Sequence, residues 1–251
     1  NGDVVYAVGG LIAASPGGNE NLWKSTNGGT TWSALTEPGD PMNLVAVAPD
    51  DPDIVVVFGD GAGTNLTGWV STNGGSTWSA LGATPGDAAQ VNAIAISPLS
   101  AGVRYIAAAG RDGAVNTGAA GIQYFNLGAA APAWVDASDA GTWTALGAIQ
   151  DDFFAVAFSP NFASDQIMVG VSHNTAAAGD VEFNIASFNQ KAWNATLFTG
   201  YPVVLESTTG AATVTITSAD ISLDPDYLGG DDTMRTAFVG AAITDSVAGQ
   251  I

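Results

Sequence analysis

An internal repeat constrains this chain of 251 residues more than any other feature of its sequence. The segment Trp23–Leu35 (WKSTNGGTTWSAL) returns almost unchanged as Trp69–Leu81 (WVSTNGGSTWSAL). A degenerate copy follows at Trp134–Leu146, and a remnant survives at Ser187–Leu197. In the first three copies two tryptophans stand nine residues apart (32 − 23, 78 − 69 and 143 − 134). Repetition of this kind predicts a stack of similar supersecondary units that share a core.

A second pattern alternates with this repeat and predicts β-strands. Apolar segments that end in proline occur at 44–49, 93–98, 155–160 and 219–225. Each is followed by a polar turn and a further apolar run, at 53–59, 104–110, 166–171 and 236–240. Short β-rich segments bounded by Pro, Gly, Asn and Asp are strand signals, and no segment keeps a period of about 3.6 residues. One unit therefore consists of an inner strand, a second strand, a third strand with the first Trp and a fourth with the second Trp.

The spacing of the units is typical of β-propeller blades. The second Trp recurs after 46, 65 and 50 residues (78 − 32, 143 − 78 and 193 − 143), and a blade takes roughly 40–50 residues. We therefore predict an all-β protein, a β-propeller or partial propeller of four-stranded antiparallel blades, within one domain over 1–251. The expected units are 3–35, 44–81, 92–146, 154–198 and, incomplete, 219–251. We interpret the extra length of the third unit, 112–133, as a surface loop with a strand at 122–125.

The repeated turn resembles the Asp-box repeat of sialidase-type propellers, whose pattern is Ser/Thr-x-Asp-x-Gly-x-Thr-Trp. The matching residues are Ser25, Gly29, Thr31 and Trp32, then Ser71, Gly75, Thr77 and Trp78, with Asn27 and Asn73 at the Asp position, and Gly141, Thr142 and Trp143 in the third copy. Asn-Gly favours a tight turn, and the Trp is expected to pack across it. The resemblance implies a structural turn that is not catalytic. The family includes sialidases, xyloglucan-cleaving glycosidases, sorting receptors, photosystem assembly factors and surface proteins, so fold alone leaves the function open.

The charge balance excludes several functions. Five Lys and Arg stand against 24 Asp and Glu, which gives a formal net charge of −19. So few bases cannot form the cluster that nucleic acid, an anionic membrane or the partner of a photosystem-type assembly factor requires. A sialidase needs three converging arginines, and two of the three available, Arg104, Arg111 and Arg235, stand seven residues apart in one unit. We therefore expect no nucleic-acid partner and no sialidase activity. No apolar run has the length of a transmembrane segment.

Other candidate sites are weaker. A glycosidase needs two facing carboxylates, and the sequence cannot pair its four glutamates, Glu20, Glu37, Glu182 and Glu206. The candidate Ca²⁺ ligands, which can equally cap turns beside proline, are Asp50, Asp51, Asp53, Asp224 and Asp226. His173 has no second His or Cys for a transition-metal site. Asn65 and Asn194 begin glycosylation sequons, which only an exported chain would use. The sequence thus predicts no cofactor, with Ca²⁺ as the one candidate ion.

Composition and unit boundaries lead to the functional prediction. Charged residues make up only 12% of the chain, Cys is absent, and weakly charged surfaces associate readily. The first unit lacks an inner strand and the last has only two strands, so we expect either a piece of a longer chain or open edges that pair with identical copies. We predict a non-catalytic extracellular or cell-surface structural protein that assembles into a homo-oligomer, lattice or filament. The alternative is a carbohydrate-active propeller that binds or cleaves glycans.

Overall fold

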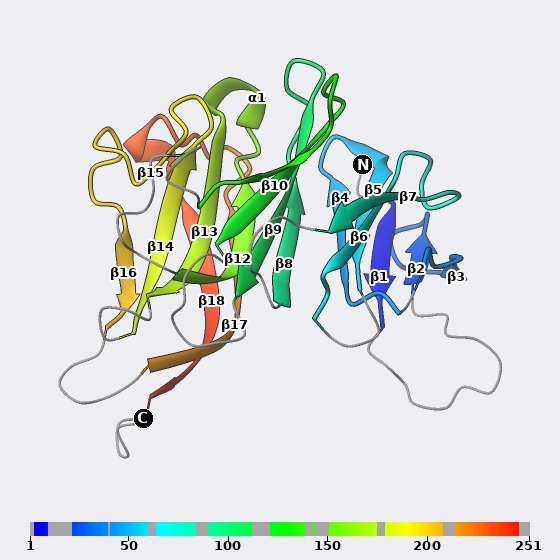
Figure 1. The fold of residues 1–251 in the computed structure, drawn as a ribbon, viewed down its shortest axis with the longest axis horizontal. Coiled ribbons are helices and arrows are strands. Elements are labelled where there is room, and N and C mark those ends of the chain that lie inside the picture. The colour runs from blue at the N-terminus through cyan, green and yellow to red at the C-terminus, as the bar shows by residue number, and fades with distance from the viewer. Residues whose placement is uncertain are drawn as a thin grey trace. The chain divides into compact units, whose positions relative to one another are not determined.

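The computed structural model describes residues 3–9, 22–39, 41–59, 64–83, 90–111, 121–138, 143, 151–174, 179–207 and 214–245 (Figure 1). Its strands form antiparallel sheets of the kind found in propeller blades, which confirms the prediction of an all-β fold with four-stranded units. The chain falls into two compact units, Asn1–Thr84 and Pro85–Ile251. The single domain expected over the whole sequence therefore stays a prediction. Among the described residues, no helix has the length and apolarity to cross a membrane.

The first compact unit contains a three-stranded and a four-stranded sheet. The three-stranded sheet consists, within the described residues, of β1 (Val5–Val8), β2 (Leu22–Ser25) and β3 (Ser33–Ala34). The four-stranded sheet consists of β4 (Leu44–Ala48), β5 (Asp51–Phe58), β6 (Thr67–Ser71) and β7 (Ser79–Ala83). Residues 55–58 of β5 are all fully buried. An uninterrupted apolar run of this kind suits a strand that is covered on both faces.

The second compact unit contains three sheets. The first consists of β8 (Gln90–Ile96), β9 (Arg104–Arg111), β10 (Ile122–Leu127) and β11 (Trp134–Asp136). The second consists of β12 (Asp151–Phe158), β13 (Ile167–Asn174), β14 (Asp180–Ser187), β15 (Ala192–Trp193) and β16 (Val203–Glu206). The third is a hairpin of β17 (Val214–Leu223) and β18 (Ala237–Asp245). Two short helices lie in connections, α1 (Phe162–Asp165) and the 3₁₀ helix η1 (Asp232–Met234).

The third predicted unit differs from expectation at 112–133. In place of a loop with a short strand, β10 is a full strand that pairs with β9 along its length and with β11 on its other side. The strand of Trp134 is therefore the fourth in its sheet and not the third. Ile122, Gln123 and Tyr124 are buried, which accounts for the extra strand. Residues 112–120 lie outside the described part of the chain.

The sheet β12–β16 has a hydrophobic cluster on each face. Phe153 and Val156 belong to the cluster shared with β9 and β10, whereas Phe154 and Ala155 belong to the cluster shared with β17. A register shift between Phe153 and Ala155 in the pairing with β13 places two successive residues in the same cluster. A bulge of this kind resets the alternation of side chains along a strand. Burial of both faces is what a blade between two neighbouring sheets requires.

The hairpin β17–β18 is covered on one face. Ile216, Ile221 and Val239 pack toward the cluster shared with β12 and β14. On β18, Phe238 is 68% exposed. Within the described residues, β18 pairs with β17 alone, so its other edge has no strand beside it.

Candidate functional site

The repeat turn, which runs from Ser25 to Trp32 in the first copy, is held by one serine and one asparagine. The Ser25 hydroxyl accepts the backbone N–H of Gly29 at 2.9 Å and donates to Asn27 Oδ1 at 2.9 Å. Asn27 Oδ1 also accepts the backbone N–H of Thr31 at 2.9 Å, and Asn27 Nδ2 donates to Thr31 Oγ1 at 2.9 Å. Asn27 thus accepts as an aspartate would and adds a donor that a carboxylate lacks.

The second copy repeats this network. Ser71 Oγ accepts the N–H of Gly75 at 2.8 Å, and Asn73 Oδ1 accepts the N–H of Thr77 at 2.9 Å. Asn73 Nδ2 donates to Thr77 Oγ1 at 2.8 Å. The same side chains therefore satisfy the same backbone groups in both copies, which is the behaviour of a structural turn.

The tryptophans that close the two repeat turns lie differently. Trp32 is 41% exposed, and its Nε1 donates to the carbonyl of Gly29 in its own turn at 2.9 Å. Trp78 Nε1 donates to the carbonyl of Thr36, which follows the first copy, at 3.1 Å. Both residues immediately precede the last strand of their sheets, β3 and β7, instead of lying in it. Trp78 thus links two sheets, whereas Trp32 closes only its own turn.

The third copy is described only at its two ends. Gly141 and Thr142 lie outside the described residues, but Trp143 is buried in the cluster between the first two sheets of the second compact unit. Asp136 occupies the position of the serine, and its Oδ1 accepts the N–H of Ser138 at 2.7 Å. A carboxylate thus caps this turn where a hydroxyl caps the first two.

Contacts between neighbouring sheets come from the same repeats. In the first compact unit Lys24 Nζ donates to the carbonyl of Gly74 at 3.0 Å. In the second, Trp193 Nε1 of the fourth copy donates to the carbonyl of Ala137 at 2.9 Å, and the bond is buried. The repeat residues therefore join sheet to sheet.

Two of the five candidate calcium ligands, Asp51 and Asp224, cap turns with their carboxylates. Asp51 Oδ1 accepts the N–H of Asp53 at 3.1 Å, and Asp224 Oδ1 accepts the N–H of Asp226 at 2.9 Å. Asp50 lies in the same turn as Asp51. Among the described residues, no three His, Cys, Asp or Glu side chains come together in a way that could hold a metal ion. The geometry thus favours the capping role that the sequence left open.

Both sequon asparagines are engaged inside the fold. Asn65 is buried, and its Oδ1 accepts from Asn43 Nδ2 at 2.7 Å. Asn194 Nδ2 donates to Asn184 Oδ1 at 2.7 Å, and Asn194 Oδ1 accepts the N–H of Ile185 at 3.0 Å. A glycan on either amide nitrogen would have to displace these contacts.

The three arginines do not form a sialidase-type cluster. Arg104 and Arg111 are the two ends of β9, so seven residues of strand, or about 23 Å, separate them. Arg235 lies in the loop between β17 and β18. His173, expected after a strand, lies within β13, and its Nε2 is 2.9 Å from the carbonyl oxygen of Val214.

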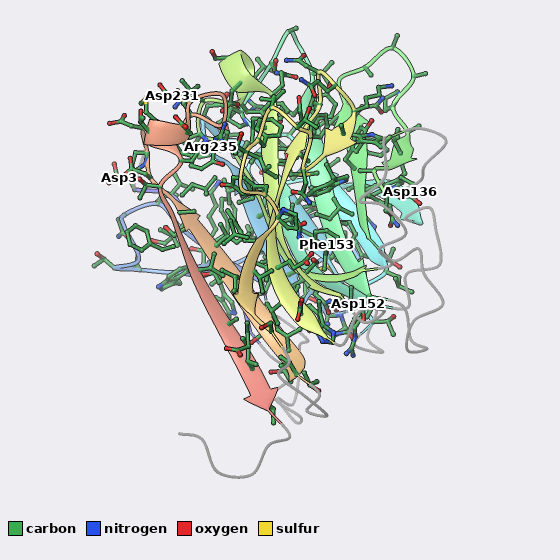
Figure 2. The ribbon with its side chains drawn as sticks, turned by 90° about the vertical axis from the view of Figure 1, so that its left-hand side faces the viewer. Asp3, Asp136, Asp152, Phe153, Asp231 and Arg235 are labelled. Atoms are coloured by element: carbon green, nitrogen blue, oxygen red, sulfur yellow. The ribbon has the colours of Figure 1, made fainter. Side chains whose placement is uncertain are left out.

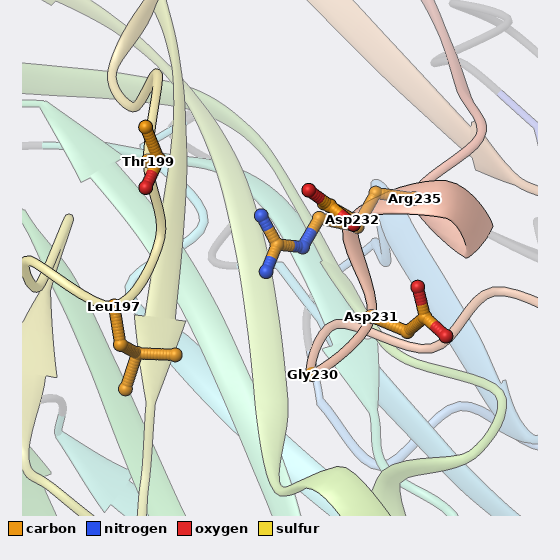
Figure 3. Close-up of a pocket in the computed structure, with 6 residues that line it drawn as sticks. All are labelled: Leu197, Thr199, Gly230, Asp231, Asp232 and Arg235. Atoms are coloured by element: carbon orange, nitrogen blue, oxygen red, sulfur yellow. The ribbon is translucent and has the colours of Figure 1, made fainter.

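An open pocket of about 340 Å³ lies between the loop after β15 and the loop that joins β17 to β18 (Figure 3). Six residues line it, Leu197, Thr199, Gly230, Asp231, Asp232 and Arg235. Figure 2 shows Asp231 and Arg235 at one end of the strands, with Asp152 near the opposite end.

Arg235 is the rigid element of this pocket. Its Nε donates to the carbonyl of Gly229 at 2.8 Å. Its Cζ lies 5.3 Å from the ring centroid of Phe198 and 5.8 Å from that of Tyr201, distances at which a guanidinium is attracted to an aromatic ring. The terminal Nη groups have no hydrogen-bond partner among the described residues. The four N–H donors that they carry are thus held in place and unused.

The two aspartates differ in their availability. Asp231 Oδ1 accepts the backbone N–H of Thr233 at 3.0 Å and its hydroxyl at 2.8 Å. These hydrogen bonds, and more weakly the charge of Arg235, hold the pKa of Asp231 below its usual range. Asp232 is exposed and makes no hydrogen bond with a described residue. Asp232 is therefore the free acceptor of the pocket.

The loop that carries the pocket is anchored to the sheet beneath it. Asp165 Oδ2 accepts the N–H of Gly229 at 2.8 Å and the hydroxyl of Ser159 at 2.7 Å. Asn161 Nδ2 donates to the carbonyl of Tyr227 at 2.8 Å. Tyr227 is fully buried, and burial raises the pKa of its hydroxyl well above the usual range, so that it stays protonated.

Glu182 is the one described glutamate that is buried. It lies on β14 and is 6% exposed, and its Oε2 is buried without a hydrogen-bond partner. Burial, and to a smaller degree the charge of Asp180, raises the pKa of Glu182. Glu37 and Glu206 are exposed, and Glu20 lies outside the described residues.

Sequence reasoning missed the pocket. It weighed Arg235 only as part of an arginine triad and Leu197 only as the end of a repeat remnant, and it did not consider Thr199. The two lining segments are more than 30 residues apart in the sequence and belong to connections between strands, so the sequence does not show that they meet. An arginine beside the Gly229-Gly230-Asp231-Asp232 turn was the one local signal.

Comparison with known proteins establishes the fold. No family model and no curated protein matches the chain. The GH74 xyloglucanase from Xanthomonas campestris is 14% identical with a TM-score of 0.51, over 89% of this chain and 32% of that one. The GH74 enzyme from Niastella koreensis is 20% identical with a TM-score of 0.46, over 77% of this chain and 27% of that one. YCF48 bound to a D1 peptide is 11% identical with a TM-score of 0.37, over 68% of this chain and 46% of that one. These are β-propeller proteins, and the chain spans less than half of the length of each.

Proposed function

We propose that this chain is a carbohydrate-binding module of the β-propeller type, with its site at the pocket beside Arg235. One observation carries the proposal: the pocket offers fixed, unused donors on Arg235 next to a free acceptor on Asp232. Its volume of about 340 Å³ lies within the range of ligand pockets, about 300–1,000 Å³. Leu197 adds an exposed apolar contact for the C–H face of a sugar. The xyloglucanase of the same fold acts on a polysaccharide, and we extend only that ligand class to this chain.

The proposal is binding and not hydrolysis. A glycosidase requires two carboxylates about 5–9.5 Å apart that act on the same bond. Of the two carboxylates in the pocket, Asp231 uses its Oδ1 to accept two hydrogen bonds from Thr233, so only Asp232 has both oxygens without a described partner. We also propose that the repeat turns are Asp-box turns with a structural role, on the support of the network shared by Ser25 and Ser71.

Calorimetric titration of the intact chain with a panel of soluble plant and bacterial oligosaccharides tests this function. We expect at least one to bind, and Asp232→Ala to weaken it about tenfold, because a hydrogen bond to a charged group contributes about 1.5–3 kcal/mol. Asp226→Ala, outside the pocket, is the matched control and should bind normally. No binding by any member of the panel would refute the proposal.

A second candidate is the structural role predicted from composition, with assembly into a homo-oligomer, lattice or filament at a cell surface. The observation that favours it is the edge of β18, which has no neighbouring strand within the described residues and carries the exposed Phe238. Unpaired edges accept strands from other chains.

A further inference from the structure

The charges that line the pocket beside Arg235 do not balance. Arg235 supplies one positive charge, and Asp231 and Asp232 supply two negative charges, while the other three lining residues are uncharged. The pocket therefore carries a net negative charge, on a chain whose own formal charge is −19. An anionic ligand would meet repulsion both in the pocket and on its approach.

Protonation does not relieve this charge near neutral pH. The hydrogen bonds from Thr233 hold the pKa of Asp231 below its usual range, so Asp231 stays ionised. The Arg235 guanidinium could pair with a ligand carboxylate through its Nη groups, but Asp231 and Asp232 line the same pocket and oppose that charge. Figure 3 shows the three side chains grouped at one side of the pocket.

A sugar hydroxyl avoids this conflict. It can accept from an Nη group of Arg235 and donate to the carboxylate of Asp232, so that both unused groups gain a partner. The hydroxyl of Thr199 and the apolar side chain of Leu197 lie across the pocket (Figure 3). A neutral, hydroxyl-rich ring therefore suits the hydrogen-bonding groups of Arg235, Asp232 and Thr199 and the apolar side chain of Leu197.

We propose, on the basis of the carbohydrate-binding function above, that this pocket selects neutral saccharides over saccharides that carry a carboxylate, and that Asp232 determines the selectivity. Asp232 holds this role because both of its carboxylate oxygens lack a described partner, whereas Oδ1 of Asp231 already accepts two hydrogen bonds from Thr233.

The test titrates the chain with pairs of oligosaccharides of equal length that differ only in one charged group, such as cellotetraose and the same tetrasaccharide with one terminal C6 hydroxymethyl group oxidised to a carboxylate. We expect the neutral member to bind at least about tenfold more tightly. Asp232→Asn keeps the shape and removes one charge, and it should reduce this preference about fivefold or more. Asp226→Asn makes the same change in net charge outside the pocket, and it should leave the preference unchanged.

The outcomes separate the two proposals. Equal or tighter binding of the acidic member overturns the selectivity while the carbohydrate-binding function stands. An unchanged preference in Asp232→Asn, or an equal change in Asp226→Asn, overturns the role of Asp232. Failure of all pairs to bind overturns the function and the selectivity together.

Discussion

At the scale of single residues, the side chains that build local turns could be predicted and those that meet across the fold could not. Ser25 and Asn27 act within one turn, so the repeated sequence was enough to assign them as turn residues. Glu182 has the same local surroundings as many strand residues, and its burial follows from the strands around it.

Glu182 leads to a prediction on pH. Burial disfavours the charged form of Glu182 and so raises its pKa in the folded state. The contribution of Glu182 to the free energy of unfolding is therefore fully present below its unfolded-state pKa, near 4.5. It is lost as the pH rises through the pKa of the folded state. Glu182→Gln should therefore raise the melting temperature, by about 2–4 °C for each kcal/mol gained, and more at about pH 8 than at about pH 5. Thermal unfolding checks this, with Glu206→Gln, at an exposed site on β16, as the control. A larger gain at the lower pH would contradict the assignment.

At the scale of elements, the strands with strong apolar patterns were predictable. The structure has strands at the apolar runs of β5 and β9 and at the inner segments that end in proline. Within each sheet these strands pair with their neighbours in the sequence. In the third unit the predicted strand at 122–125 is present and extends to Leu127 as β10, but the sequence placed Trp134 in the third strand of the unit instead of the fourth. The strand state of β10 is set by pairing with β9 and β11, which are contacts between segments that no local window contains.

The link between neighbouring sheets through Trp193 leads to a second prediction. Trp193→Phe removes the buried hydrogen bond to the carbonyl of Ala137 and leaves that acceptor without its partner. The loss should cost about 1–3 kcal/mol, or about 2–4 °C of melting temperature for each kcal/mol. Trp32→Phe, at an exposed tryptophan that bonds only within its own turn, should cost less. Differential scanning fluorimetry compares the two, and an equal loss in both would show that the bond between sheets adds nothing.

At the scale of the whole molecule, the net charge and the edge of β18 have opposite effects on association between copies of the chain. Copies with a formal charge of −19 are expected to repel one another at low salt. Within the described residues, by contrast, the edge of β18 has no neighbouring strand and carries the exposed ring of Phe238. From composition the sequence predicted association, because few of its residues are charged, and it did not weigh the sign of the charge. Which strand lies at the edge of a sheet depends on which strands pair with one another. The sequence predicted only that the last unit is incomplete, and it did not identify the edge strand.

The proposed assembly through β18 should therefore depend on salt and on the exposed side chain at this edge. The chain should associate more strongly as salt is added, because screening weakens the repulsion between copies. Phe238→Lys removes exposed apolar surface and places a charge of the kind that blocks edge pairing, and it should reduce association several-fold. Leu99→Lys makes the same chemical change at another exposed apolar residue, 47% exposed, and should not. Sedimentation velocity over a range of concentrations measures the effect. A wild-type chain that stays monomeric at high salt, or equal association in both variants, would exclude this edge as the contact between copies.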